Sequence, residues 1–227
     1  MAEIKADYID HLGDDLRVVN AARVSFAKEA LTFEGKDAKL LKYLATHQHW
    51  TPFAHCMITL RETVPIFVAR QRFKHMVGFT YNEVSRRYVD DEPEFYVPDV
   101  WRSRPEGSVK QGSGESVISS ITIDDGLDET SVYEQSPSSA YEELVFSAQK
   151  LYNEMLKAGV APEQARMVLP QSMMTSYYVT GSLAAFARAY KQRIDPHAQK
   201  EIQDLAVQWD EIIRPLYPHA WSAMVDD

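Results

Sequence analysis

The sequence has one cysteine, no signal peptide and no long apolar run, and each absence excludes a class of protein. Cys56 stands alone among 227 residues, which excludes an internal disulfide and a cysteine-cluster metal site. No stretch approaches the roughly 20 apolar residues that span a bilayer. The N-terminus also lacks the charged and apolar regions of a secretory signal. We therefore expect a cytoplasmic location and no membrane partner.

Several nucleotide and metal motifs are also missing. The nine glycines are scattered and form neither GxGxxG nor GxxxxGK[ST], so a Rossmann turn or a P-loop is not expected. There is no GxSxG elbow to present a serine nucleophile. His47, His49 and His55 are clustered, but no HExxH spacing, carboxylate or thiol completes a metal site with them. Any bound phosphate would have to be met by side chains, and no metal is expected.

Positive charge is scarce overall and concentrated in one place. The net charge is -9, yet residues 70–88 place five Lys or Arg side chains and one His in nineteen positions. Like charges brought together lower stability unless a ligand neutralises them, so this cluster predicts a small anion such as a nucleotide phosphate. The acidic whole repels polyanions, and we expect no nucleic-acid partner. The cluster comprises Arg70, Arg72, Lys74, Arg86 and Arg87.

Hydrophobic spacing predicts a chain that is mostly helical in its C-terminal half. Alternation over 56–64 predicts a strand and puts Cys56 on its apolar side, as a buried filler. Pro65 is predicted to open a helix, and Asp195-Pro196 to cap and open another. We expect one domain over 1–227, with a surface insertion at about 99–139 that contains a short strand at 117–123. Helices are predicted at 14–30, 36–50, 65–75, 137–158 (a core helix), 161–170, 182–194 and 197–213.

Several short blocks, taken in order, resemble the flavin-dependent thymidylate synthase family. The resemblance extends over nearly the whole chain outside the insertion. It implies an α/β fold with a central sheet flanked by helices, assembled as a homotetramer whose active sites are shared between subunits. The blocks are AARVSF at 21–26, HWTPFAH at 49–55, PIFVARQ at 65–71, NEVSRRY at 82–88, EFYVP at 94–98, ARMVLP at 165–170 and QRIDPHAQKEIQ at 192–203.

The family's signature motif is altered here. It reads RHR, seven residues and then Ser, whereas this chain has Lys74-His75-Met76 and eight residues before Ser85. Lys74 keeps the charge but loses the planar fork of arginine, and Met76 loses the charge. Ser182 stands where the family commonly has asparagine, and Ala184 where it has an arginine that meets the cofactor, so a modest FAD affinity is expected.

The resemblance implies two groups of site residues. Arg193 would stabilise negative charge that develops on the uracil, and Ser85 would position the nucleotide. The dUMP site would comprise Gln71, Lys74, Glu83, Val84, Ser85, Arg86, Arg87, Arg166 and Arg193. The FAD site would comprise Ser25, His49, Thr51, Lys74, His75, Met76, Glu83, Ser182 and Arg188.

The implied reaction is reductive methylation of dUMP to dTMP, with methylenetetrahydrofolate as carbon donor and NADPH-reduced FAD as hydride donor. Two rivals stay open: hydroxymethylation of a deoxypyrimidine monophosphate on the same scaffold, and a non-catalytic nucleotide-binding or RNA-binding homologue. Plainer roles also stay open for single residues. Arg86-Arg87 would suit a solvated turn, Glu83 a surface ion pair, and Arg188 and Arg193 ordinary helix cations.

Overall fold

The computed structural model describes residues 2–88, 91–107, 111–124, 126 and 132–226, and it divides into two compact units. The sheet unit comprises Ile4–Thr63, Val68–Glu83 and Ser176–Asp227. The long-helix unit comprises Met1–Glu3, Val64–Phe67 and Val84–Thr175. Residues 99–139 all belong to the long-helix unit, and their assignment as a surface insertion stays a prediction.

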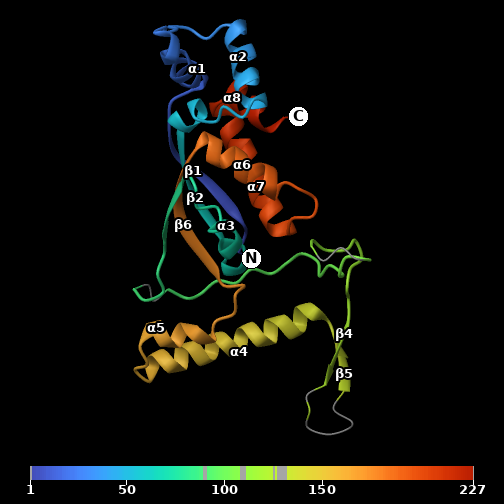
Figure 1. Cartoon of the computed structure of the whole chain (residues 1–227). Coiled ribbons are helices and arrows are strands. Elements are labelled where there is room, and N and C mark those ends of the chain that lie inside the picture. Colours follow the sequence, from blue (N-terminus) through green and yellow to red (C-terminus); the bar gives the residue numbers. More distant parts are fainter. Residues whose placement is uncertain (1, 89–90, 108–110, 125, 127–131, 227) are drawn as a thin grey trace. The chain divides into compact units, whose positions relative to one another are not determined.

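A four-stranded sheet in the order β1-β2-β6-β3 organises the sheet unit (Figure 1). The strands are β1 (Lys5–Leu12), β2 (Met57–Pro65), β6 (Met174–Ser182) and β3 (Phe79–Glu83). β1 pairs antiparallel with β2, and β3 pairs antiparallel with β6. The strand predicted at 56–64 is confirmed as β2. Hydrophobic spacing did not reveal the other three strands.

Helices α6 (Leu183–Arg193) and α7 (Lys200–Leu216) cover the apolar face of this sheet. Alternate residues of β2 are fully buried, because successive side chains of a strand point to opposite faces. Trp209 of α7 packs edge-on against Phe186 of α6, with ring centroids 6.1 Å apart. The predicted α/β class, with a sheet flanked by helices and a largely helical C-terminal half, is confirmed.

The buried position of Cys56 is also confirmed. Its side chain is 0% exposed at the start of β2. Burial raises the pKa of the thiol to about 12, so the group stays protonated at neutral pH. Cys56 is therefore a packing residue and not a nucleophile.

Two predicted helix starts are wrong. Pro65 is the last residue of β2, and α3 spans Ile66–Arg72. The carboxylate of Asp195 accepts a hydrogen bond from the backbone N–H of His197 at 2.8 Å, which closes a local turn. α7 begins only at Lys200. An aspartate before a proline is compatible with either a turn or a helix cap, and tertiary context selected the turn.

The N-terminal helices pack against the C-terminal one. α1 (Asp15–Arg23) and α2 (Gly35–Thr46) both contact α8 (Pro218–Val225). The short 3-10 turn η1 (Val24–Phe26) lies between α1 and α2, and η2 (Pro52–His55) lies between α2 and β2. The buried carboxylate of Asp15 accepts hydrogen bonds from the backbone N–H groups of His219 and Ala220, at 2.9 and 2.8 Å. This acid therefore satisfies the N-terminus of α8. Among the described residues, no helix is long and apolar enough to cross a membrane.

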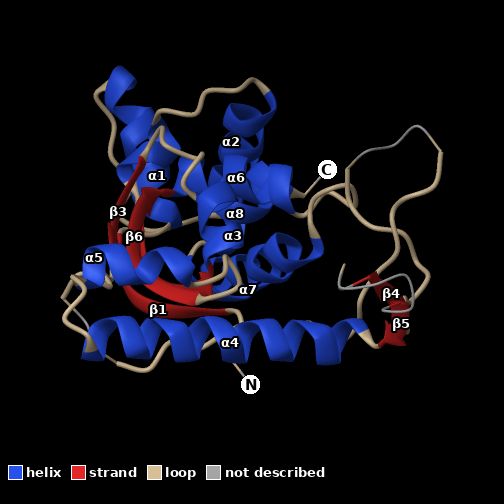
Figure 2. Cartoon of the chain, turned by 90° about the horizontal axis from the view of Figure 1, so that it is seen from below, coloured by secondary structure: helices blue, strands red, loops and turns tan. Residues whose placement is uncertain are grey.

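The long-helix unit is built on α4 (Pro137–Lys157), with α5 (Pro162–Ala165) alongside it (Figure 2). It also contains the hairpin of β4 (Ile121–Asp124) and β5 (Val132–Gln135), and the 3-10 turn η3 (Arg166–Val168). The short strand predicted at 117–123 appears as β4, shifted by a few residues. The expectation that α4 is a core helix is wrong. Tyr152 is buried, but Leu144, Phe146 and Leu151 are 60%, 68% and 51% exposed. Periodicity shows which side of a helix is apolar, not what covers it.

Candidate functional site

The turn that follows α3 meets the C-terminal end of α6 in the sheet unit. Beyond α3 the chain turns tightly: the backbone N–H of Lys74 donates to the carbonyl of Gln71 at 3.2 Å, and that of His75 to Arg72 at 3.1 Å. This turn aims the His75 ring at Arg193, whose Nε donates to His75 Nε2 at 2.8 Å. Two predicted site residues, His75 and Arg193, are thereby brought into contact.

A second contact joins the same turn to the segment before α7. The side-chain amide of Gln71 donates to Gln199 Oε1. Gln199 in turn donates to the carboxylate of Glu201 at 2.9 Å. Gln71 is thus held by the segment between α6 and α7, whereas Arg193, at the end of α6, is held by His75.

The electrostatics around His75 favour its neutral form. The side chain is buried, and burial lowers its pKa to about 4, helped by the nearby charges of Arg193, Arg72 and Arg188. At neutral pH its Nε2 is therefore an unprotonated acceptor, and the ring proton lies on Nδ1. Burial and the charge of Arg72 also lower the pKa of Arg193, but arginine stays charged. The pair is a neutral imidazole that orients a cation.

Arg72 does not belong to the predicted anion-binding cluster. It is fully buried and forms an ion pair with Glu62, Nε to Oε2 at 3.0 Å. The Glu62 carboxylate also accepts from Tyr177 Oη at 2.6 Å and from Trp209 Nε1 at 2.9 Å. Counting basic residues in the sequence could not separate this internal cation from exposed ones such as Arg70.

The altered part of the signature motif forms a loop against the start of α6. The backbone N–H of Ser182 donates to the carbonyl of Gly78 at 3.1 Å, and Arg188 Nη2 donates to the carbonyl of Val77. Gly78 has φ +81, and a Cβ there would lie 2.9 Å from Ala185 Cβ. Glycine is required for this close approach. The extra residue of the motif is thus accommodated by a loop that packs on α6.

Three of the residues predicted for FAD lie at or beside this loop and have different surroundings. Ser182 is 8% exposed, and its Oγ accepts from the backbone N–H of Ala185 at 3.2 Å, which caps α6. Met76 is 74% exposed. Arg188 is an exposed residue whose guanidinium is tied to the loop through the carbonyl of Val77.

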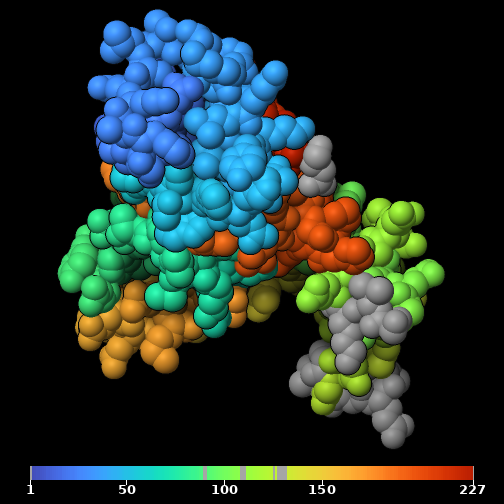
Figure 3. Space-filling view, turned by 45° about the horizontal axis from the view of Figure 1, so that its top comes forward, coloured from blue at the N-terminus to red at the C-terminus, as the bar shows by residue number. Residues whose placement is uncertain are grey.

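The remaining site residues of the sheet unit are exposed on loops or at a strand end. Ser25 lies in η1, and His49 and Thr51 lie between α2 and η2. The blue N-terminal segment that contains η1 and α2 forms part of the surface seen in Figure 3. The ring of His49 is edge-on to Tyr43 at 6.2 Å. Lys74 is exposed in the turn after α3, and Glu83 ends β3.

Five predicted residues belong to the long-helix unit. The Oγ of Ser85 accepts from the Nε of Arg87 at 3.2 Å, and the Arg87 guanidinium lies 5.0 Å from the centre of the Tyr88 ring. Arg86 donates to the carbonyl of Asp91. Ser85 has no histidine base in these contacts, which agrees with a positioning role. Also in this unit, Val84 is 45% exposed, and Arg166, in η3, donates to the carbonyl of Glu163 at 3.3 Å.

Sequence reasoning missed Glu62, Tyr81 and Gln199. A signal for Glu62 was present, because in an alternating strand it lies on the same side as the buried Ile58 and Leu60. A carboxylate on the apolar side of a strand needs a buried cation, and Arg72 is the partner. Tyr81 and Gln199 had no such signal, since their partners are set by tertiary contacts.

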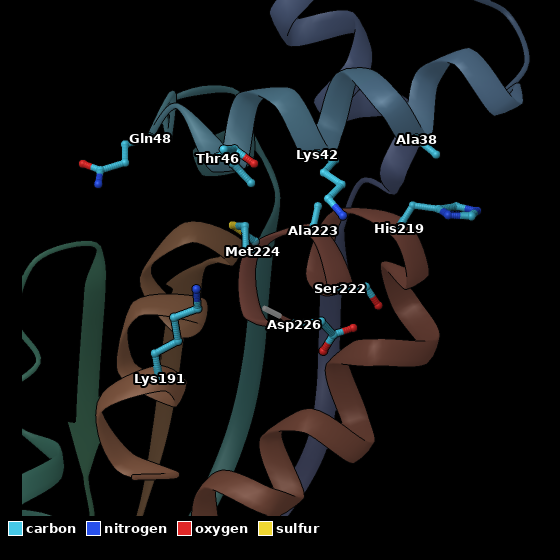
Figure 4. Close-up of a pocket in the computed structure, with 11 residues that line it drawn as sticks. Ala38, Lys42, Thr46, Gln48, Lys191, His219, Ser222, Ala223, Met224 and Asp226 are labelled. Atoms are coloured by element: carbon cyan, nitrogen blue, oxygen red, sulfur yellow. The ribbon is translucent and has the colours of Figure 1, made fainter.

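A separate cavity of about 610 Å³ lies among α2, α6 and α8 (Figure 4). Lys42 of α2 and Lys191 of α6 point toward it from opposite sides. None of the predicted site residues lines it. Among the described residues, no group of three or more His, Cys, Asp or Glu side chains is placed to hold a metal ion.

Comparison with known proteins identifies the family. Residues 7–219 match the family described as thymidylate synthase complementing protein. Flavin-dependent thymidylate synthases of Thermosipho africanus and Thermotoga neapolitana are 37% and 36% identical, each over 96% of this chain and 89% of the relative. The crystal structure of the UMP/dUMP methylase PolB from Streptomyces cacaoi, bound with 5-Br dUMP, has a TM-score of 0.78 at 29% identity and covers 98% of this chain and 94% of its own. This chain is therefore an enzyme of the flavin-dependent thymidylate synthase family, as its ordered motifs indicated.

Proposed function

We propose that this enzyme converts dUMP to dTMP, with methylenetetrahydrofolate as carbon donor and with FAD reduced by NADPH. The names of the relatives support a flavin and a thymidylate product. The likeness to a methylase bound with 5-Br dUMP supports a uridine nucleotide as substrate. We also propose a homotetramer with shared active sites, as membership of the family implies.

The observation that carries the proposal is the orientation of Arg193. Its Nε donates to the neutral, buried His75, and among the described residues the Arg193 side chain makes no other hydrogen bond. The two terminal amino groups therefore remain for a substrate. A guanidinium fixed in this way is preorganised to stabilise negative charge on a uracil carbonyl as C5 becomes nucleophilic. Preorganisation matters because no reorganisation is then needed in the transition state.

The nucleotide phosphate would be bound by the exposed cations. Arg87 and Arg166 present planar forks suited to phosphate oxygens, and Lys74 adds a point charge. Ser85 would position the nucleotide and does not attack it. Cys56 is buried and protonated, so neither residue supplies a covalent nucleophile. Gln71, Glu83, Val84 and Arg86 complete the proposed dUMP site.

The side chains proposed for FAD offer donors of the right chemistry. Ser25 and Thr51 bring hydroxyl groups, His49 an exposed ring, and Lys74 and Arg188 positive charge for the phosphates. Bound FAD supplies the hydride chemistry that no side chain provides. The contributions of the chain are to hold the nucleotide, to exclude water and to direct Arg193 at the uracil. His75, Met76, Glu83 and Ser182 complete the proposed set.

The test is product analysis with FAD-reconstituted protein, dUMP, NADPH and methylenetetrahydrofolate. Mass spectrometry should show dTMP. Arg193→Ala should bind flavin but lose turnover, whereas Lys191→Ala, on the same helix, should keep it. Full activity of Arg193→Ala would refute the assignment. A hydroxymethylated product would favour hydroxymethylation of the nucleotide on the same scaffold. A protein that recovers no flavin absorbance on adding FAD would favour a non-catalytic nucleotide-binding or RNA-binding homologue. UMP should be offered in parallel, because the solved relative is named for both nucleotides.

A further inference from the structure

His75 depends on a fixed backbone to present Nε2 to Arg193. The contact is 2.8 Å long, and a small rotation of the turn would break it. The ring sits just beyond the end of α3, in a turn closed by the backbone bonds from Lys74 to Gln71 and from His75 to Arg72. The carbonyl groups of this turn are free to accept a further bond from a side chain outside it.

The Tyr81 hydroxyl holds the turn from β3. Tyr81 Oη lies 2.7 Å from the carbonyl oxygen of His75 and 3.3 Å from that of Arg72. The hydroxyl has one proton to donate, and the shorter bond goes to His75. It accepts in return from Arg72 Nη1 at 2.7 Å. One hydroxyl thus joins the two ends of the turn.

Arg72, on the far side of this link, is itself held by several contacts. The guanidinium of Arg72 stacks between Phe79 and Trp209, 4.4 and 4.6 Å from the ring centres. Its Nε is held by Glu62. Burial raises the pKa of Tyr81 to about 12, so its hydroxyl keeps the proton needed for the bond to His75. The order of contacts is Glu62, Arg72, Tyr81, His75 and Arg193.

We propose that Tyr81 is a positioning residue for Arg193, acting through the backbone of His75. This inference rests on the proposed function, since it gives Arg193 its task. Tyr81 contacts neither nucleotide nor flavin in this scheme. It fixes the turn so that His75, with its proton on Nδ1, accepts from Arg193.

The test compares two tyrosines of one buried network. Tyr81→Phe removes the hydroxyl and keeps the ring against Phe73, 5.0 Å away. Tyr177→Phe is the matched control, because its hydroxyl binds Glu62 but not the turn. We expect Tyr81→Phe to lower kcat for dTMP formation about tenfold, the loss of one hydrogen bond. KM for dUMP and FAD affinity should change less than twofold. Tyr177→Phe should keep the wild-type kcat. An equal loss of kcat in both variants would overturn the inference.

A second measurement does not depend on activity. Nitrogen-15 NMR of labelled histidine, with the His75 signal assigned from His75→Gln, reports which ring nitrogen carries the proton. We expect Nε2 of His75 to be unprotonated in the wild type and in Tyr177→Phe, and a mixture of tautomers in Tyr81→Phe. An unchanged spectrum in Tyr81→Phe would overturn the inference. A wild type that forms no dTMP would refute the proposed function alone, and this spectrum would then decide the role of Tyr81.

Discussion

Replacing Arg72 by methionine should be among the most damaging single changes in the sheet unit. The wild-type guanidinium donates to the fully buried Glu62 at 3.0 Å and to Oη of the partly buried Tyr81 at 2.7 Å. Arg72→Met leaves the Glu62 carboxylate buried without a cation. Methionine has a similar length and would still lie between the two aromatic rings, so little cavity is created. The cost is therefore mainly electrostatic.

The magnitude follows from what Glu62 retains. Removing one partner of a buried ion pair typically costs about 3–5 kcal/mol. Tyr177 and Trp209 still donate to Glu62, at 2.6 and 2.9 Å, and offset part of the loss. We therefore expect a destabilisation near the lower end, about 3 kcal/mol. For a chain of this size that corresponds to a decrease in Tm of roughly 6–12 °C.

The assay is thermal unfolding followed by far-UV circular dichroism, with Arg70→Met as control. Arg70 is exposed on the same helix, so its variant should stay within about 0.5 kcal/mol of the wild type. Adding Glu62→Gln to Arg72→Met removes the orphaned charge and should restore part of the lost stability. If Arg72→Met were as stable as Arg70→Met, the buried ion pair would not support the fold and the reasoning would be wrong.

Three further predictions concern burial, protonation and capping. Cys56→Ala should keep turnover within twofold of wild type. The native thiol should resist iodoacetamide at neutral pH because burial raises its pKa to about 12. Rapid labelling of the folded protein would contradict this burial. The pKa of His75 falls from 6.5 to about 4 on folding, so the free energy of unfolding is highest above about pH 6.5 and decreases by up to about 3 kcal/mol as the pH falls toward 4. Denaturant titrations at several pH values should show that the free energy of unfolding of His75→Gln depends less on pH over this range than that of the wild type. Asp15→Asn should cost about 1–2 kcal/mol in the same titrations, since it weakens the cap of α8, and no change would show that the cap is dispensable.

Local patterns predicted the elements whose signals are contained in one segment. β2 was found because its residues alternate, and the end of α4 because Gly159, with φ +86, follows it. The strands β1, β3 and β6 were missed, since pairing with distant segments stabilises them. The start of α7 was misplaced because Asp195 closes a turn of its own.

The sequence by itself determined the family and the α/β class, because ordered motifs are properties of the chain alone. It also predicted Gln71, His75 and Arg193 as site residues, which stays a prediction. Tertiary structure alone decided which cations are available to a ligand. Arg72 and Arg70 look alike in the sequence, but one is buried against Glu62 and the other is exposed. Burial and partner choice depend on segments far apart in the chain, such as β2, α3 and α7, and only folding brings them together.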